Sequence, residues 1–224
     1  TIDYITIATE GNVTDFGNLV GTRSNSTALS NSIRACCTGG NNVIEFVTIS
    51  STGNATDFGD LTTPTVGVGG AADTTRGIFA GGIVPGATRV NTIQYITFAT
   101  TGDATDFGDL SVARRNPAGT SDSTRGVFFG GNDSGGTNVI DFVTIQSAGN
   151  ATDFGDSTSN QSNASGASDS IRGVFSAGYY GSPHLSNVIE KVIIQTTGNS
   201  VDYGDLIDER IQGGSVSDSH GGLE

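Results

Sequence analysis

Five stretches of the chain are rich in β-branched and aromatic residues, a pattern typical of β-strands. They occupy residues 1–9, 43–50, 92–100, 139–146 and 188–195. Apolar side chains occur on both faces: Ile44 and Phe46 point one way, and Val47 and Ile49 point the other. A strand that is apolar on both faces is expected to be covered on both sides.

Three other kinds of segment repeat together with these strands. An apolar segment that begins with Arg and ends in small residues precedes every stretch except the first, as in RGVFFGG at 125–131. A run rich in Gly, Ala, Ser and Thr, such as 65–73, lies before that Arg segment. A pentad of the TDFGD type follows each stretch, and its first Asp recurs at spacings of 42, 49, 47 and 49 residues. Each repeat therefore predicts four strands. The pentad residues are Asp15, Asp57, Asp106, Asp153 and Asp202.

The repeats predict an all-β fold, a five-bladed β-propeller of four-stranded blades that forms a single domain over residues 1–224. Small side chains suit the inner strand, which crowds around a central channel. The N-terminal unit lacks its first two strands, and Asp218 and Ser219 match the Asp-Ser pairs before Arg125 and Arg172. We therefore expect 218–224 to pair with the N-terminal strand and close the first blade, which leaves no open sheet edge. The expected units are about 1–30, 31–72, 73–121, 122–168 and 169–217.

The repeat resembles the Kelch family, in which a strand ending in a Gly pair is followed by a Tyr-bearing strand and then by a Trp. Gly81-Gly82 and Gly130-Gly131 match the Gly pair, whereas Lys191 and Ala177 depart from the pattern. The resemblance covers nearly the whole chain and implies a Kelch-like propeller. Matching aromatic residues are Tyr4, Phe46, Tyr95 and Phe142 at the Tyr position and Phe16, Phe58, Phe107, Phe154 and Tyr203 at the Trp position.

Composition and charge disfavour several classes of partner. The 34 Gly residues and only four Pro fit short strands and frequent turns. A net charge of −13 argues against a sequence-independent grip on nucleic acid and against binding to an anionic membrane. No stretch is apolar enough to predict a transmembrane helix. The chain shows neither an initiator Met nor a signal peptide, so we expect a processed or excised segment.

Asn and Asp residues recur three apart around each pentad, and oxygen ligands at such spacing could hold Ca²⁺. The same residues next to Gly also form Asx-turns, in which the side chain accepts a hydrogen bond from the backbone without an ion. We favour the turn interpretation because the set recurs in every unit, and we expect no metal or cofactor. The calcium candidates are Asp57, Asp60, Asp106, Asp109, Asp153 and Asp156.

The first residue of each Arg segment follows an Asp or Asn by three positions. We expect these Arg side chains to tie adjacent strands or blades through charge-assisted hydrogen bonds. Cys36 and Cys37 occupy the positions of Val127 and Phe128 in the repeat and are expected to be small core residues. The structural Arg residues are Arg34, Arg76, Arg125 and Arg172.

No catalytic constellation is recognisable. His184 and His220 are the only histidines, and neither a nucleophile elbow nor a zinc-hydrolase motif is present. We therefore expect no catalytic residues and do not expect an enzyme. A glycan-cleaving propeller that uses pairs of carboxylates is the alternative.

Two sets of loops vary between units: those joining the second and third strands and those joining one unit to the next. In an up-and-down blade both sets emerge on the same face, and a uniform scaffold with one diversified rim is typical of binding proteins. The expected ligand-binding residues are Tyr179, Tyr180, His184, Arg114 and Arg115.

The unit TGNATDFGD resembles one that recurs in structural and tail-fibre-type proteins of tailed phages. This resemblance implies a virion or cell-surface location and a host-surface glycan or protein as the partner. We therefore expect a non-catalytic binding or adhesion module. The alternative is a structural or decoration protein that binds other virion subunits.

Overall fold

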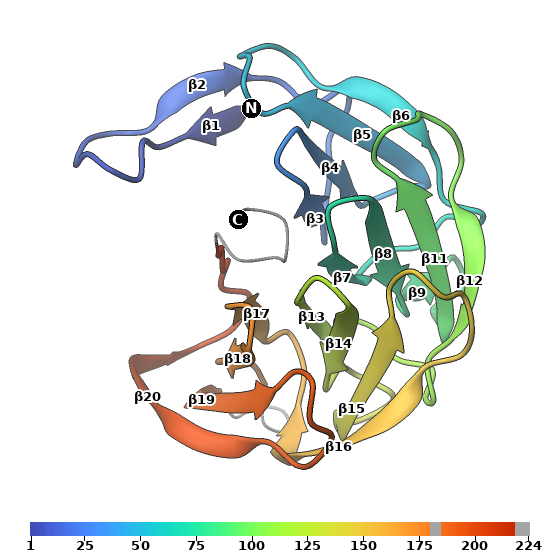
Figure 1. Cartoon of the computed structure of the whole chain (residues 1–224), viewed down its shortest axis with the longest axis vertical. Helices are drawn as coiled ribbons and strands as arrows, with labels where there is room; N and C mark the ends of the chain where they lie inside the picture. Colours follow the sequence, from blue (N-terminus) through green and yellow to red (C-terminus); the bar gives the residue numbers. More distant parts are fainter. Residues whose placement is uncertain (180–184, 218–224) are drawn as a thin grey trace.

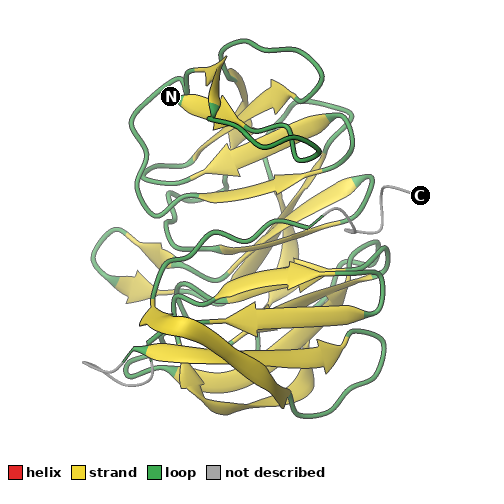
Figure 2. Ribbon diagram, turned by 90° about the vertical axis from the view of Figure 1, so that its left-hand side faces the viewer, coloured by secondary structure: helices red, strands yellow, loops and turns green. Residues whose placement is uncertain are grey.

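A computed structural model describes residues 1–179 and 185–217, and this part of the chain contains strands and loops but no helix (Figure 2). Four antiparallel sheets of four strands each are arranged around a central axis as the blades of a β-propeller (Figure 1). No helix in the described ranges could span a membrane. The predicted all-β propeller architecture is therefore confirmed.

The strands follow the predicted order within each blade, from the small-residue strand at the axis to the pentad strand at the periphery. The first two blades comprise β3 (Thr27–Ser30), β4 (Arg34–Thr38), β5 (Val43–Thr48) and β6 (Thr56–Asp60), then β7 (Gly69–Ala72), β8 (Arg76–Ala80), β11 (Thr92–Thr97) and β12 (Thr105–Asp109). The other two comprise β13 (Ala118–Ser121), β14 (Arg125–Phe129), β15 (Thr137–Thr144) and β16 (Thr152–Gln161), then β17 (Ser165–Ser168), β18 (Arg172–Ser176), β19 (Ser186–Ile193) and β20 (Val201–Arg210). Two short hairpins are additional: β1 (Ile2–Tyr4) with β2 (Thr14–Gly17), and β9 (Ile83–Val84) with β10 (Thr88–Arg89).

The prediction of five blades is wrong. Strands β1 and β2 pair only with each other, whereas every complete blade has four strands. Residues 211–217 form no strand, and 218–224, which were expected to close the first blade, lie outside the described residues. The third strand of each complete blade pairs with an Arg-bearing second strand, and β1 has no such neighbour within the described ranges. The segment GGSVSDS also offers a single large apolar side chain, too little to cover a strand.

Residues 213–217 nevertheless lie beside the inner strand of the last blade. The Ser165 hydroxyl donates to the carbonyl of Gly213, and the Ser168 amide lies 3.5 Å from the Ser217 hydroxyl. The segment therefore lines the central channel without joining a sheet.

Predicted unit boundaries differ from the blades by one strand. The boundaries expected at 31, 73, 122 and 169 fall directly after β3, β7, β13 and β17. Each of these inner strands pairs with the Arg-bearing strand that follows it. The inner strand therefore begins a blade and does not end one.

The hydrophobic core lies between blades. Phe58 of the first blade packs in one cluster with Phe79 and Phe98 of the second, and two further clusters join the second blade to the third and the third to the fourth. Cys36 is fully buried in the first of these clusters, as expected. Inner strands approach so closely that a Cβ atom at Gly119 would lie 2.1 Å from the carbonyl oxygen of Gly70. The blades are thus stabilised by one another.

Consecutive units are also joined at their outer edge by three hydrogen bonds, which we call the inter-blade lock. Between the first and second blades, Gly102 N donates to Phe58 O at 2.7 Å and Ala104 N donates to Asp60 O at 2.8 Å. In the opposite direction, Asp60 N donates to the side-chain oxygen of Asp103 at 3.0 Å. The same three bonds join the β1–β2 hairpin to the first blade, the second blade to the third and the third to the fourth.

Candidate ligand-binding face

The two sets of variable loops lie on the same face of the propeller, as predicted. Short antiparallel bridges connect them within each of three blades, joining Val66 to Ile83, Arg115 to Asn132 and Ser162 to Tyr179. Arg89, on the β9–β10 hairpin, extends this network by donating to the backbone and side-chain oxygens of Asn132 in the next blade. These loops form the variable face.

A series of four backbone hydrogen bonds runs around the axis on this face from Asn25 to Gln212, and within the described residues no such bond joins these two ends. Asn116 N donates to Gly67 O at 2.6 Å, Asn163 N donates to Asn116 O at 3.3 Å, and Gln212 N donates to Asn163 O at 3.2 Å, while Gly67 N donates to Asn25 O at 3.4 Å. All five residues have positive φ, between 49° and 65°, a conformation that Asn and Gly adopt most readily. We call these five residues the axial ring.

The axial ring lines a cavity of about 340 Å³. Its other lining residues include Ser26 and Thr27, and no charged side chain lines it within the part of the chain that the structure describes. The carboxamides of Asn116 and Asn163 are joined by a hydrogen bond of 2.5 Å. Because a carboxamide both donates and accepts hydrogen bonds, the cavity presents both functions without net charge.

A buried polar side chain in the third strand of each blade holds the loop that precedes the blade. Glu45 accepts from Val20 N at 2.7 Å, Gln94 from Thr62 N at 2.7 Å, Asp141 from Ser111 N at 3.1 Å and Glu190 from Thr158 N at 3.3 Å. All four side chains belong to residues that are at most 3% exposed. These anchors fix where each loop leaves the outer strand for the variable face.

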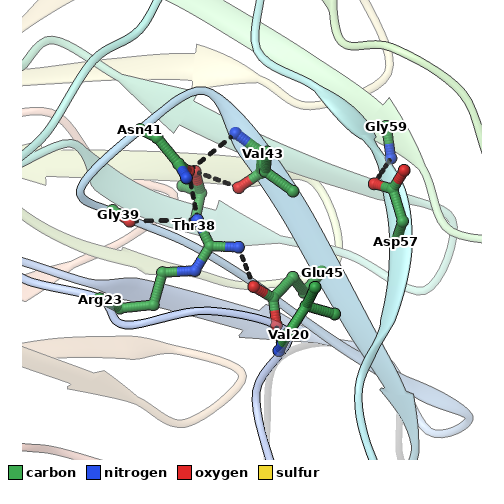
Figure 3. Close-up of polar contacts among 9 residues, drawn as sticks. All are labelled: Val20, Arg23, Thr38, Gly39, Asn41, Val43, Glu45, Asp57 and Gly59. Carbon is green, nitrogen blue, oxygen red and sulfur yellow. Dashed lines mark hydrogen bonds and ion pairs between the residues drawn. The ribbon is translucent and has the colours of Figure 1, made fainter.

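In the first blade the anchor is Glu45, which forms an ion pair with Arg23 (Figure 3). The same guanidinium donates to the carbonyl of Gly39 at 3.2 Å and to the side-chain oxygen of Asn41. Arg23 therefore connects the loop before the blade, the loop between β4 and β5, and the third strand. It is a structural residue of the variable face.

The placement of Arg114 corrects its expected role as a ligand-binding residue. Its side chain is 0% exposed and pairs with the equally buried Asp141 at 2.9 Å. Burial lowers the pKa of Arg114, and the neighbouring Asp141 carboxylate opposes this shift. A guanidinium without exposed surface is not available to a ligand, so Arg114 stabilises the loop beneath the face.

The other predicted rim residues are distributed differently. Arg115 is half-buried beside the axial ring residue Asn116, and its backbone pairs with Asn132. Tyr179 is half-buried, and its backbone exchanges hydrogen bonds with Ser162, the neighbour of Asn163. Tyr180 and His184 lie outside the described residues.

Three of the five pentad Asp residues make the contact that the turn interpretation predicts. Asp57, Asp153 and Asp202 each accept a hydrogen bond from the Gly two positions later, at 3.2, 3.1 and 3.0 Å (Figure 3 shows the first). Asp60 and its counterparts Asp109 and Asp156 contribute backbone groups to the inter-blade lock. No cluster of three metal-ligating His, Cys, Asp or Glu residues occurs in residues 1–179 and 185–217.

Three of the four repeated Arg residues tie blades together, as predicted. The guanidinium of Arg76 lies 4.6 Å from the ring centre of Tyr95 and donates to Ile145 O of the next blade at 3.2 Å. Arg34 and Arg125 stack on Phe46 and Phe142 and donate to the equivalent carbonyls in the blades that follow them. Arg172 instead pairs with Asp169 of its own blade, and both side chains are well exposed.

The axial ring and the buried anchors were missed at the sequence level. The ring residues Asn25, Gly67, Asn116, Asn163 and Gln212 recur at spacings of 42, 49, 47 and 49, the same as the pentads. The anchors recur as the acidic or amide residue that directly follows the first Ile of each third strand. Both signals were present in the repeat and could have been found by comparing the units position by position.

No protein-family model matches the chain, and no curated protein is detectably similar to it. These comparisons therefore identify neither the Kelch family nor a phage protein family. The function is therefore inferred from the architecture of the blades and the chemistry of the variable face.

Proposed function

We propose that the protein is a non-catalytic binding module that holds a neutral, hydroxyl-rich ligand, such as the end of a glycan chain, in the cavity of the axial ring. The observation that carries the proposal is the set of carboxamides that lines a cavity of about 340 Å³ at the centre of the variable face. The surrounding loops differ between blades and supply selectivity.

The chemistry of the cavity favours a neutral ligand over a charged one. A net charge of −13 repels anions, and the described lining contains no carboxylate that would hold a cation. Sugar hydroxyls both donate and accept hydrogen bonds, as carboxamides do. The resemblance of the repeat unit to phage tail-fibre-type proteins supports a place on a virion or cell surface and a host glycan as the ligand.

The test combines a glycan array with calorimetry of the best-bound glycan. Asn163→Gly and Asn116→Gly remove one carboxamide each but keep the backbone conformation, because Gly67 already occupies an equivalent position in the ring. Each is expected to weaken binding about tenfold, the equivalent of ~1.4 kcal/mol. Thr101→Ala, an exposed residue of a hairpin that belongs to neither set of variable loops, is the matched control and is expected to bind like the wild type.

Two results would contradict the proposal. One is an array on which no neutral glycan is bound. The other is a bound glycan whose affinity is unchanged by Asn163→Gly and Asn116→Gly, because the ligand would then lie elsewhere on the molecule.

A further inference from the structure

The inter-blade lock is made four times in the described chain, and one unpaired half remains at each end of the series. By position in the repeat, Tyr203 and Asp205 on β20 correspond to Phe154 and Asp156, whose backbone groups join the lock. We call this the outgoing half. At the other end, Gly11, Asn12 and Val13 correspond to Gly53, Asn54 and Ala55, and we call them the incoming half.

The side chains at the two unpaired halves are exposed where their counterparts are buried. Tyr203 is 54% exposed, whereas Phe58, Phe107 and Phe154 are at most 3% exposed. Val13 is 63% exposed, whereas its counterpart Ala55 is 8% exposed. Each half thus exposes apolar surface at positions where Phe58, Phe107, Phe154 and Ala55 are buried.

In the described chain, the backbone of the outgoing half lacks the close contact that the glycine of each completed lock makes. A Cβ atom at Gly155 would lie 2.5 Å from the backbone of Gly198 in the next blade, and Gly17, Gly59 and Gly108 meet their neighbours equally closely. At Gly204 no atom of the described chain lies within 4 Å of that position. The surface is therefore shaped to receive a Gly-Asn turn, and no turn of the described residues occupies it.

The Arg contacts indicate the same missing neighbour. Arg76 and Arg125 donate to Ile145 and Ile194 of the following blades, both 0% exposed. The corresponding pair is Arg172 and Ile7, and Ile7 is 87% exposed. A cavity of about 190 Å³ lies between Arg172, Val174 and Tyr203 on the exposed face of the last blade.

We propose that the outgoing half of one copy of this chain binds the incoming half of a second copy, head to tail. The occupant is a second copy because the missing surface is the one that the chain itself carries. The incoming half of the second copy offers the backbone N–H groups of Gly11 and Val13 and the side-chain oxygen of Asn12. These groups match the carbonyls of Tyr203 and Asp205 and the amide of Asp205 in the outgoing half of the first copy. In the structure the two halves stand at opposite ends of the arc, and no hydrogen bond joins them within the described residues (Figure 1).

Such a contact is heterologous, because each copy uses two different surfaces. This asymmetry permits a mixing test by sedimentation. The wild type is expected to show a mass that rises with concentration above 22.7 kDa. Val13→Glu damages only the incoming half and Tyr203→Lys damages only the outgoing half, so each variant alone is expected to stay a monomer in neutral-pH buffer.

The decisive experiment mixes two variants, each of which retains one intact half of the lock. Tyr203→Lys retains the incoming half. Val13→Lys retains the outgoing half and replaces Val13→Glu in this mixture, because two like charges keep the two damaged halves from pairing. An equimolar mixture is expected to form a one-to-one dimer, while Ile207→Glu, which alters a 98% exposed residue of β20, is the matched control and associates like the wild type.

Three outcomes would overturn the proposal. The first is a wild type that remains at 22.7 kDa at every concentration. The second is association that Ile207→Glu abolishes as fully as Val13→Glu does. The third is a wild type that stays monomeric while Val13→Glu and Tyr203→Lys both lower its melting temperature. The two halves would then bind each other within one chain.

Discussion

The Arg residue that begins each second strand shows how one side chain can join two blades. In three of the four blades its guanidinium lies over an aromatic ring of its own blade and donates to a main-chain carbonyl of the next, as Arg125 does with Phe142 and Ile194. Arg suits this role because its planar group stacks and donates at the same time. The role was predictable from the recurrence of Arg, but its partner was not, since a backbone carbonyl leaves no signal in the sequence.

Arg125→Ala is expected to lower the free energy of unfolding by ~2 kcal/mol, through the loss of the stacked cation and a hydrogen bond from a charged donor. Arg172→Ala is the matched control, because Arg172 is well exposed and pairs with Asp169 of its own blade. Urea denaturation of both variants provides the measurement. Equal destabilisation of the two would show that the contact between blades is not the source of the effect.

Cys36 should make the fold sensitive to high pH. Burial raises the pKa of this thiol from 9.0 to about 12, so the folded chain keeps a proton that the unfolded chain loses above pH 9. This contribution to stability is complete below pH 9 and is lost as the pH rises toward 12. Between pH 8 and 10.5 the wild type is expected to lose more free energy of unfolding than Cys36→Ala does. Parallel curves for the two proteins in urea titrations would contradict this.

At the scale of single strands, the third strand of each blade both fills the core and positions a loop. Its apolar residues and its place in the repeat were predicted correctly from β-branched and aromatic content. The anchor position was not recognised, because one acidic residue in an apolar strand resembles an ordinary exposed position. Its partner is a loop amide some thirty residues earlier, as with Ser111 and Asp141. A hydrogen bond between residues so far apart in sequence depends on how neighbouring blades pack, and the sequence of a single strand does not specify that packing.

Removing Arg114 alone should reduce the stability of the fold more than replacing both Arg114 and Asp141 with neutral residues. Arg114→Met leaves a buried carboxylate without its cation and is expected to destabilise the fold by ~3–5 kcal/mol. Adding Asp141→Asn is expected to restore much of this loss, because Gln94 shows that a neutral acceptor serves at the same position of the second blade. Thermal and urea unfolding of both variants test the prediction. A double variant no more stable than Arg114→Met would contradict it.

At the scale of the whole molecule, the repeat predicted the propeller but not the number of blades. Five pentads were counted, yet a pentad marks only an outer strand, and a blade also requires an inner strand and an Arg-bearing strand. The β1–β2 hairpin has the pentad at Asp15 and lacks the other two within the described residues. Only four Arg-bearing strands exist, and the fifth blade was expected because residues 218–224 were assigned to complete the N-terminal unit.

The arrangement of the blades also creates a site that no single unit contains. Each unit contributes one residue to the axial ring, and the cavity arises only when Asn25, Asn116, Asn163 and Gln212 are brought around one axis. For this reason the variable face could be predicted from loop diversity, while its centre could not.

The most direct measurement is a nuclear magnetic resonance titration that follows the side-chain amide signals of the protein with a bound glycan. If the axial ring binds the glycan, the signals of Asn116 and Asn163 are expected to shift first and furthest, with smaller changes in the neighbouring variable loops. Shifts confined to the pentad hairpins, or unchanged carboxamide signals in a saturated complex, would show that the axial ring is not the binding site.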